Sequence, residues 1–211
     1  DKGPWVIQNK GTQAKPYVVT IDGAVTLNGS GSAVFQIKGS CVQFTGKNGA
    51  QITSDQGTLI DISADSNVTV GAIGMTAKGK EIYIKNAGTL TLAGADMKLI
   101  DSDGNNYFAT EDWIVNSGTL TVNGGSYQGS VSYAYNGQTG RLVFSGGTIR
   151  FLSGVLESIC EGNGYGMSGA DVTVTGGEIK NCGFCAIKLN GGSRLHIGKD
   201  AKFSENWEDI S

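Results

Sequence analysis

One block of sequence recurs along the chain with small changes. Its four clearest copies are GTLTLAGADM from Gly88, GTLTVNGGSY from Gly118, GRLVFSGGTI from Gly140 and ADVTVTGGEI from Ala170. A repeat of this kind indicates that one supersecondary unit is stacked many times, because a single copy cannot bury its apolar side without neighbours. The repeat therefore constrains the fold strongly, whereas no catalytic constellation stands out.

The copies align on a first apolar residue, and successive anchors lie 22 to 30 residues apart. These anchors are Val42, Val68, Leu90, Leu120, Leu142, Val172 and Leu195. A second apolar residue follows each anchor two positions later, which is the alternation of a strand with one buried side. Five copies carry a further apolar residue at anchor plus seven, namely Met75, Met97, Tyr127, Ile149 and Ile179. Each repeat is thus predicted to contain two or three strands.

The composition excludes a helical repeat, since the 211 residues include 34 Gly, and Thr and Val fill the repeats. Short strands, glycine-rich bends and a constant repeat length predict an all-β, single-domain parallel β-helix, with an antiparallel sandwich as the alternative fold. We expect residues 1–24 to form an N-terminal cap and first coil, 25–197 the repeating coils and 198–211 a C-terminal cap, with Trp5 and Trp207 as capping side chains. Asn86 and Asn116, each four residues before an anchor, are expected to form a buried amide ladder.

The segments VTVTGGEIKN (Val172 to Asn181) and AIKLNGGSRLHI (Ala186 to Ile197) resemble the right-handed parallel β-helix repeats of pectate-lyase-like proteins. They resemble even more the glycine-rich repeats of bacterial cell-surface proteins, and weaker copies extend back to about Val34. The resemblance implies a right-handed solenoid, and the seven anchors predict about seven to eight coils. Its family includes polysaccharide lyases, glycoside hydrolases, adhesins and passive stalks, so the resemblance reports fold more than activity.

Charge and hydropathy limit which partners and which cellular location are expected for the chain. The net charge of −3 comes without clustered Lys and Arg, so no nucleic-acid partner is expected. No apolar run approaches 18 residues, so no membrane span is expected. The start at Asp1 without a charged and apolar leader fits a processed protein. We therefore expect a bacterial secreted or cell-surface monomer that is part of a larger protein.

Two kinds of site residue are candidates for metal binding or cross-linking. Asp101, Asp103 and Asn105 lie in one insertion and offer oxygen ligands for calcium, although their composition is also that of an ordinary turn. No other cofactor is expected. Cys160 and Cys182 are predicted to be neighbours on adjacent coils, so that a bridge from Cys160 to Cys182 or to Cys185 is compatible with the spacing of coils. Buried free thiols are the equally weighted alternative.

Ligand contacts are expected mainly on the loops of the two long coils, the second of which spans Phe151 to Ser168. Aromatic loop residues that could stack on sugar rings are Tyr107, Tyr133, Tyr135 and Tyr165. The position after the anchor-plus-seven residue carries Lys98, Arg150 and Lys180, which form a mildly basic outward stripe or simply a solvated surface. A regular outward file of Thr69, Thr91, Thr121, Val143 and Thr173 follows the anchors by one residue.

These features lead to a non-catalytic adhesive or glycan-binding module whose partner is an extracellular polysaccharide or a host or cell-surface glycoprotein. An extracellular polysaccharide lyase or glycoside hydrolase is the alternative, and a bare structural spacer is a third class. The enzyme would need acids and a base converging in a groove, whereas the binding module needs only an exposed patch that fits its ligand.

Overall fold

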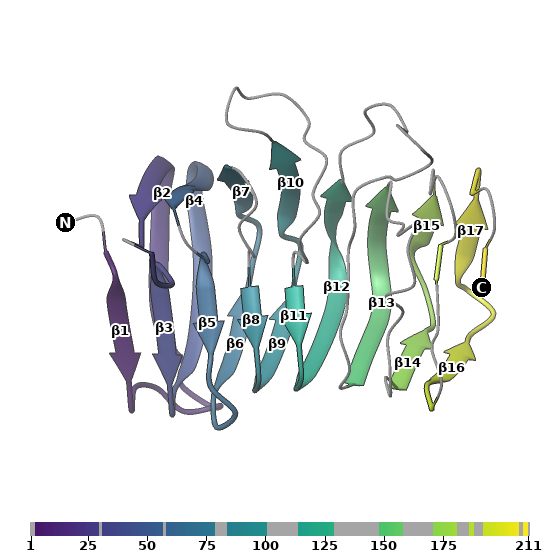
Figure 1. Ribbon diagram of the computed structural model, residues 1–211, viewed down its shortest axis with the longest axis horizontal. Coiled ribbons are helices and arrows are strands. Elements are labelled where there is room, and N and C mark those ends of the chain that lie inside the picture. Colours follow the sequence, from purple (N-terminus) through teal and green to yellow (C-terminus); the bar gives the residue numbers. More distant parts are fainter. Residues whose placement is uncertain are drawn as a thin grey trace.

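The computed structural model describes residues 3–29, 31–56, 58–78, 84–100, 114–128, 148–157, 171–180, 186–187, 192–206 and 209–210. All regular structure in these ranges is β, and every strand pairing in them is parallel. The strands stack side by side from the N-terminal to the C-terminal end of an elongated solenoid (Figure 1). The predicted all-β parallel β-helix is therefore confirmed.

Each turn of the solenoid begins on a sheet that we call the first face. It consists of β1 (Trp5–Gln8), β3 (Phe35–Lys38), β5 (Ile60–Ile62), β8 (Ile84–Asn86) and β11 (Ile114–Asn116), in that spatial order. Trp5, which the sequence assigned to a cap, lies in β1 and pairs with Phe35 of β3. The segment around it is thus the first rung of the ladder.

The remaining strands form the other two sides of each turn. The second face contains β6 (Asn67–Val70), β9 (Thr89–Leu92), β14 (Asp171–Val174) and β16 (Arg194–Ile197). The third face contains β7 (Gly74–Lys78), β10 (Asp96–Ile100), β15 (Glu178–Lys180) and β17 (Lys202–Ser204). Four longer strands run across both faces, namely β2 (Tyr17–Asn28), β4 (Cys41–Gln56), β12 (Thr119–Gln128) and β13 (Thr148–Glu157). Their first halves pair on the second face and their second halves on the third.

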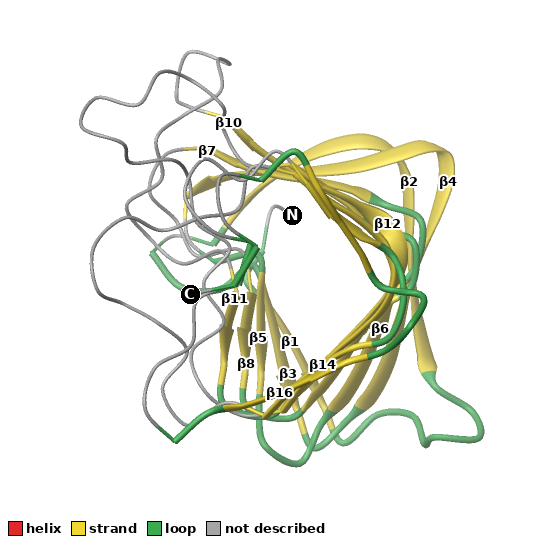
Figure 2. Ribbon diagram, turned by 90° about the vertical axis from the view of Figure 1, so that its right-hand side faces the viewer, coloured by secondary structure: helices red, strands yellow, loops and turns green. Residues whose placement is uncertain are grey.

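The winding is right-handed. In Figure 1 the chain descends through the first face, rises behind it and advances from left to right, and Figure 2 shows the same face at the left of the cross-section. Each of the five described first-face strands is followed by strands on the second and third faces, so five turns can be followed through all three faces in the described part of the chain. The second-face column from Tyr17 to Leu195 has eight rungs, which compares with the seven to eight coils expected from the sequence.

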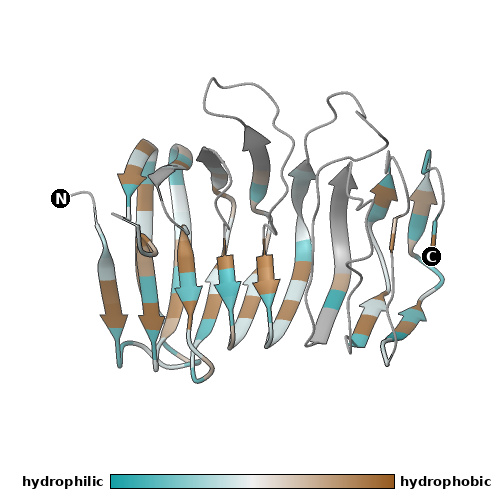
Figure 3. Ribbon diagram, viewed as in Figure 1, coloured by the Kyte–Doolittle hydropathy of each residue, from teal (hydrophilic) through white to brown (hydrophobic). Residues whose placement is uncertain are grey.

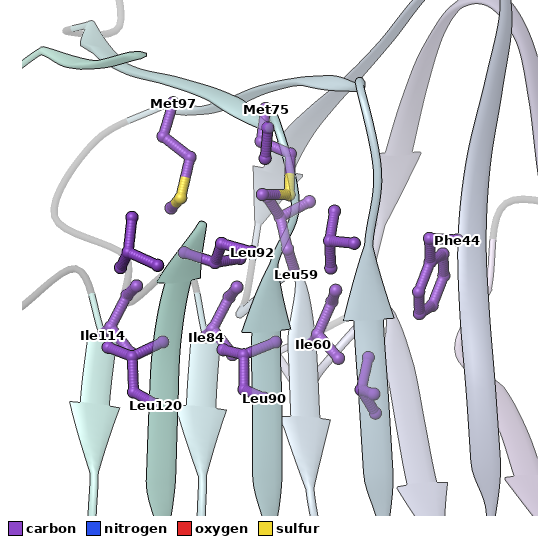
Figure 4. Packing of buried hydrophobic residues seen from close by; sticks show 14 of the residues in the cluster. Phe44, Leu59, Ile60, Met75, Ile84, Leu90, Leu92, Met97, Ile114 and Leu120 are labelled. Carbon is purple, nitrogen blue, oxygen red and sulfur yellow. The ribbon is translucent and has the colours of Figure 1, made fainter. Parts of the chain in front are cut away.

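Equivalent residues of successive turns stack in columns that fill the interior. Alternation of apolar and polar residues along a strand is visible in β5 (Figure 3), where Ile60 and Ile62 are buried and Asp61 is exposed. Figure 4 shows isoleucines of the first face meeting leucines of the second and methionines of the third. A fully buried leucine such as Leu90 contributes roughly 1.5–3 kcal/mol to folding. The core is thus assembled from short strands that could not fold alone.

The glycine that opens each GTLT block is required by close packing at the corner between the first and second faces. A Cβ on Gly118 would overlap the carbonyl oxygen of Gly88 in the turn below, and a Cβ on Gly88 would overlap the carbonyl oxygens of Ser63 and Ser66. Thr89 in turn donates its backbone N–H to Ser66, at 2.9 Å. The corner therefore admits no side chain at this position.

The predicted amide ladder is confirmed on the first face. Asn86 and Asn116 are neighbours in the pairing of β8 with β11, and both are buried. The Asn86 side-chain amide donates to Asn116 Oδ1 at 2.7 Å and to the carbonyl of Thr119 at 3.0 Å. Asn116 donates to the carbonyl of Gly118 at 3.2 Å. The two amides thus link successive turns and cap the corner between faces.

One repeat is out of register with the prediction. Ile149 pairs with Leu120 and with Val172, so Ile149 occupies the anchor position that the sequence analysis gave to Leu142. Leu156, in turn, pairs with Tyr127 and occupies the anchor-plus-seven position that had been given to Ile149. The assignment of Phe151–Ser168 to a second long coil is therefore wrong, because the long connection lies between β12 and β13.

Candidate functional site

Most of the residues expected to bind ligands lie outside the described part of the chain. These are the tyrosines Tyr107, Tyr133, Tyr135 and Tyr165, the calcium candidates Asp101, Asp103 and Asn105, and the cysteines Cys160 and Cys182. Their roles stay predictions. Within the described residues, no group of three or more His, Cys, Asp and Glu side chains is placed to hold a metal ion.

The expected basic stripe is divided between two faces. Lys98 and Lys180 lie on the third face, where Lys98 pairs with Gln128 and Lys180 with Glu157. Arg150 is exposed on the second face instead, between Thr121 and Thr173. The three cations therefore do not form one column. The difference arises because the observed register of β13 differs from the predicted one, and this places Arg150 on the second face instead of the third.

The expected threonine file is present on the outer side of the second face. Thr69 pairs with Thr91, and Thr91 pairs with Thr121. Arg150 occupies the place predicted for Val143, and Thr173 follows it. The full outward column runs Val18, Gln43, Thr69, Thr91, Thr121, Arg150, Thr173 and His196. His196 is exposed, as expected.

A groove of about 340 Å³ lies at the N-terminal end of this column, and we call it the corner groove. It forms where the connection from β1 to β2, residues 9–16, projects beside the strand wall at the lower right of Figure 2. Its lining consists of Gln13, Pro16, Cys41, Val42, Gln43, Asn67, Thr69 and Thr91. The groove is therefore built from four successive turns of the solenoid.

Specific backbone contacts fix the loop that makes one wall of the groove. Lys10 donates its backbone N–H to the Ser40 hydroxyl at 3.0 Å, and Cys41 donates its own to the carbonyl of Lys10 at 2.9 Å. Thr12 and Lys15 exchange backbone hydrogen bonds of 2.9 and 3.1 Å across the tip of the loop. Gly11 has a φ of 69°, and a Cβ there would overlap the carbonyl oxygen of Cys41. The loop is thus held against the start of β4.

The chemistry of the corner groove is polar and uncharged. Gln13, Gln43 and Asn67 supply side-chain amides, which both donate and accept hydrogen bonds, and Thr69 and Thr91 supply hydroxyl groups. Cys41 is a half-buried free thiol at one edge. None of the eight lining residues carries an ionisable carboxylate or a cation. Such a surface can bind a neutral, hydroxyl-rich ligand by hydrogen bonds.

The described titratable groups with altered pKa values lie away from this groove. A hydrogen bond from the Ser63 hydroxyl, together with one from the Gly39 backbone N–H, lowers the pKa of Asp65 below its usual value. Asp65 thereby stabilises the corner between the first and second faces in its charged form. Burial, with the nearby charge of Asp96, raises the pKa of Tyr127. Both groups serve the scaffold.

The corner groove was not among the sites predicted from the sequence. The threonines of its strand wall, Thr69 and Thr91, could be predicted, because they belong to the outward file recognised from the repeats. Its loop wall could not, because Gln13 meets the outer side of β4, β6 and β9 only through packing between turns. The one local signal was Gly11, which marks a backbone that must come close to another segment.

Comparison of the chain with protein-family models gave no match, and comparisons with curated proteins and with solved structures gave none either. The described residues contain no helix of the length and apolar character needed to cross a membrane. The class of fold therefore rests on the structure itself, which is a parallel β-solenoid.

Proposed function

We propose that this chain is a non-catalytic glycan-binding module of a bacterial surface or secreted protein, and that it holds a sugar chain in the corner groove. The observation that carries the proposal is the lining of that groove of about 340 Å³, which includes three side-chain amides and two hydroxyl groups. Sugar hydroxyls donate and accept hydrogen bonds at once, as amides do, so the two surfaces are chemically matched.

The outer column of the second face supports an elongated ligand. Gln43, Thr69 and Thr91 stand on consecutive rungs, which are spaced about 4.8 Å apart in a parallel sheet. A sugar chain lying along the rod would therefore meet an equivalent hydrogen-bonding group at each step. The likeness of the repeats to those of bacterial surface proteins supports the extracellular setting.

The charge distribution favours a neutral glycan over an acidic one. Among the described residues of its outward column Arg150 is the one cation, and Lys180 lies beside Glu157 in the backbone register of β15 with β13. A polyanionic glycan would gain little from cations that are separated in this way, because exposed single charges are strongly screened by salt. We therefore propose a neutral polysaccharide or the neutral glycan of a surface glycoprotein as the partner.

The test begins with a glycan array probed with the whole chain, with and without calcium, followed by calorimetry on the glycan that binds best. The variants Gln43→Ala and Asn67→Ala should each weaken that affinity about tenfold, which corresponds to about 1.4 kcal/mol. Thr173→Ala is the matched control, because Thr173 lies in the same outward column but outside the groove. Unchanged affinity in both groove variants would refute the site.

The same samples distinguish the other readings of the sequence. Loss of binding in Tyr107→Ala, Tyr135→Ala or Tyr165→Ala, with the groove variants unaffected, would move the site to the loops predicted from the sequence. Calcium-dependent binding that disappears in Asp101→Ala or Asp103→Ala would establish the predicted metal site. Shortened or unsaturated products would overturn the non-catalytic proposal and identify a hydrolase or a lyase.

A further inference from the structure

The N-terminal end of the solenoid is an open apolar surface. A cavity of about 470 Å³ opens there, and its apolar lining includes Trp5, Ile7, Val19, Ile21, Val25 and Leu27. Tyr17 and Val18, at the start of β2, are 46% and 52% exposed. In the first turn, Tyr17, Val19 and Val25, which correspond to core residues in the turns that follow, are therefore exposed or only partly buried.

The backbone at this end is also incompletely paired. In the described part of the chain β1 pairs with β3 alone, and β2 pairs with β4 alone. Both strands lie at the left end of Figure 1 with their outer edges uncovered. An uncovered strand edge offers a row of N–H and C=O groups to another strand, which is a recognised route to association.

The C-terminal end of the solenoid also has unpaired strand edges and exposed apolar side chains. There β16 pairs with β14 and β17 pairs with β15, and neither has a second neighbour among the described residues. Ile197 and Ile210 are 40% and 41% exposed. Both ends of the rod therefore combine strand edges with partly exposed apolar side chains.

The apolar columns of the core run from one end to the other and stop at matching positions. The second-face columns begin at Tyr17 and Val19 and end at Leu195 and Ile197. The third-face column begins at Val25 and ends at Phe203. If a second molecule continued the ladder in the same register, Tyr17 would stack on Leu195, Val19 on Ile197, and Val25 on Phe203.

From this match we propose that two copies of the chain associate head to tail, the N-terminal end of one docking on the C-terminal end of the other. The partner is a second copy because it supplies parallel strands on the second and third faces in the required register. A two-fold arrangement of N-terminal ends would reverse the strand direction and the order of the faces, so it could not continue the second-face and third-face ladders together. Head-to-tail contacts do not close on themselves and can therefore extend into chains.

This inference differs from the monomer that the sequence suggested, and it is independent of the corner groove. Its test is sedimentation velocity of the whole chain over about a hundredfold range of concentration, because self-association makes the mass depend on concentration. We expect the weight-average mass to rise above that of the monomer by at least about twofold. A constant monomer mass over that range would overturn the proposal.

Two end variants test the polarity of the contact. Val19→Asp places a charge at the N-terminal end and Ile197→Asp places one at the C-terminal end, so each variant alone should remain monomeric. Their equimolar mixture should form a one-to-one complex, because each variant keeps one intact end. Complex formation also shows that both variants are folded. Oligomers of either variant alone would refute the head-to-tail geometry, and Thr121→Asp, in the middle of the second face, should associate as the wild type does.

A further variant avoids apolar core positions altogether. Val18 and His196 point outward and are exposed, and they would become cross-strand neighbours in the docked pair. The double variant V18E/H196E brings two carboxylates together only in the associated form, and like charges across strands are destabilising. It should keep the unfolding midpoint of the wild type and lose self-association. Unchanged association would contradict the proposed register.

Discussion

At the scale of single residues, the most consequential buried polar pair is Asn86 with Asn116. Asn86 Oδ1 is buried and receives no hydrogen bond from the described residues, because its neighbour in the preceding turn is Ile62. Its amide nitrogen, by contrast, serves both Asn116 and the carbonyl of Thr119. The amide ladder therefore begins at Asn86, and its hydrogen bonds are donated to residues of the next turn towards the C-terminal end.

The pair should behave as one unit in stability measurements. Asn86→Ala and Asn116→Ala should each lower the free energy of unfolding by about 1–3 kcal/mol, because each leaves buried polar groups unpaired. The double variant should cost less than the sum by about 0.5–1.5 kcal/mol, since the two residues share one hydrogen bond. Urea unfolding of the four proteins measures this coupling. Strict additivity would show that the amide contact contributes nothing.

Tyr127 gives a prediction for alkaline pH. Its hydroxyl is buried and donates to the carbonyl of Gly124 at 2.9 Å, and burial raises its pKa above the ordinary value of 10.0. A raised pKa favours the protonated folded state, so this contribution is complete below pH 10.0 and decreases as the pH rises further. The unfolding free energy of the wild type should therefore fall more steeply between pH 9 and 11 than that of Tyr127→Phe. Parallel curves would contradict this.

At the scale of elements, the sequence located most strands because period-two alternation and the anchor columns are local signals. The anchors from Val42 to Leu120 stack as expected. The fifth repeat failed for a specific reason. Leu142, Phe144 and Ile149 have the same spacing as Ile149, Phe151 and Leu156, so the pattern fits twice, seven residues apart.

The choice between these two registers depends on pairing with neighbouring turns, which the local pattern does not contain. The candidate site likewise combines residues that the local pattern predicts with residues that it does not. The outward threonines could be read from the repeats, whereas the corner groove depends on a loop that packs across turns far apart in sequence. The columns formed by equivalent residues of the strands can therefore be predicted from the repeats. The contacts made by the loops that connect the strands are much less predictable.

The register of β13 can be tested with two adjacent residues. Phe151 is buried, 3% exposed, and stacks between Val122 and Val174, whereas Arg150 is exposed. Phe151→Ala should lower the free energy of unfolding by about 3–5 kcal/mol, as large-to-small changes in a packed core do. Arg150→Ala should change it by less than about 0.5 kcal/mol. Similar, small effects of both changes in thermal and urea unfolding would reject this register.

At the scale of the whole molecule, the solenoid is a one-dimensional stack in which each turn contacts only its neighbours. In such a stack, stability is approximately a sum of terms for single turns and for the interfaces between them. Asn67 and Thr89 occupy equivalent places in consecutive turns, and so do Val68 and Leu90. Removing the segment that separates them should therefore take out one turn and leave the columns aligned.

Deletion of residues 67–88 joins Ser66 directly to Thr89, which then takes the place of Asn67 against Cys41 of β4. The shortened chain should fold into the same solenoid with a lower free energy of unfolding and a rod shorter by about 4.8 Å, measurable by small-angle X-ray scattering. Deletion of residues 67–77 is the matched control. It removes about half a turn and puts Lys78 and the residues that follow β7 in sequence in second-face positions, so it should abolish cooperative unfolding. If both deletions unfolded alike, the turns would not be the independent units that the stacking implies.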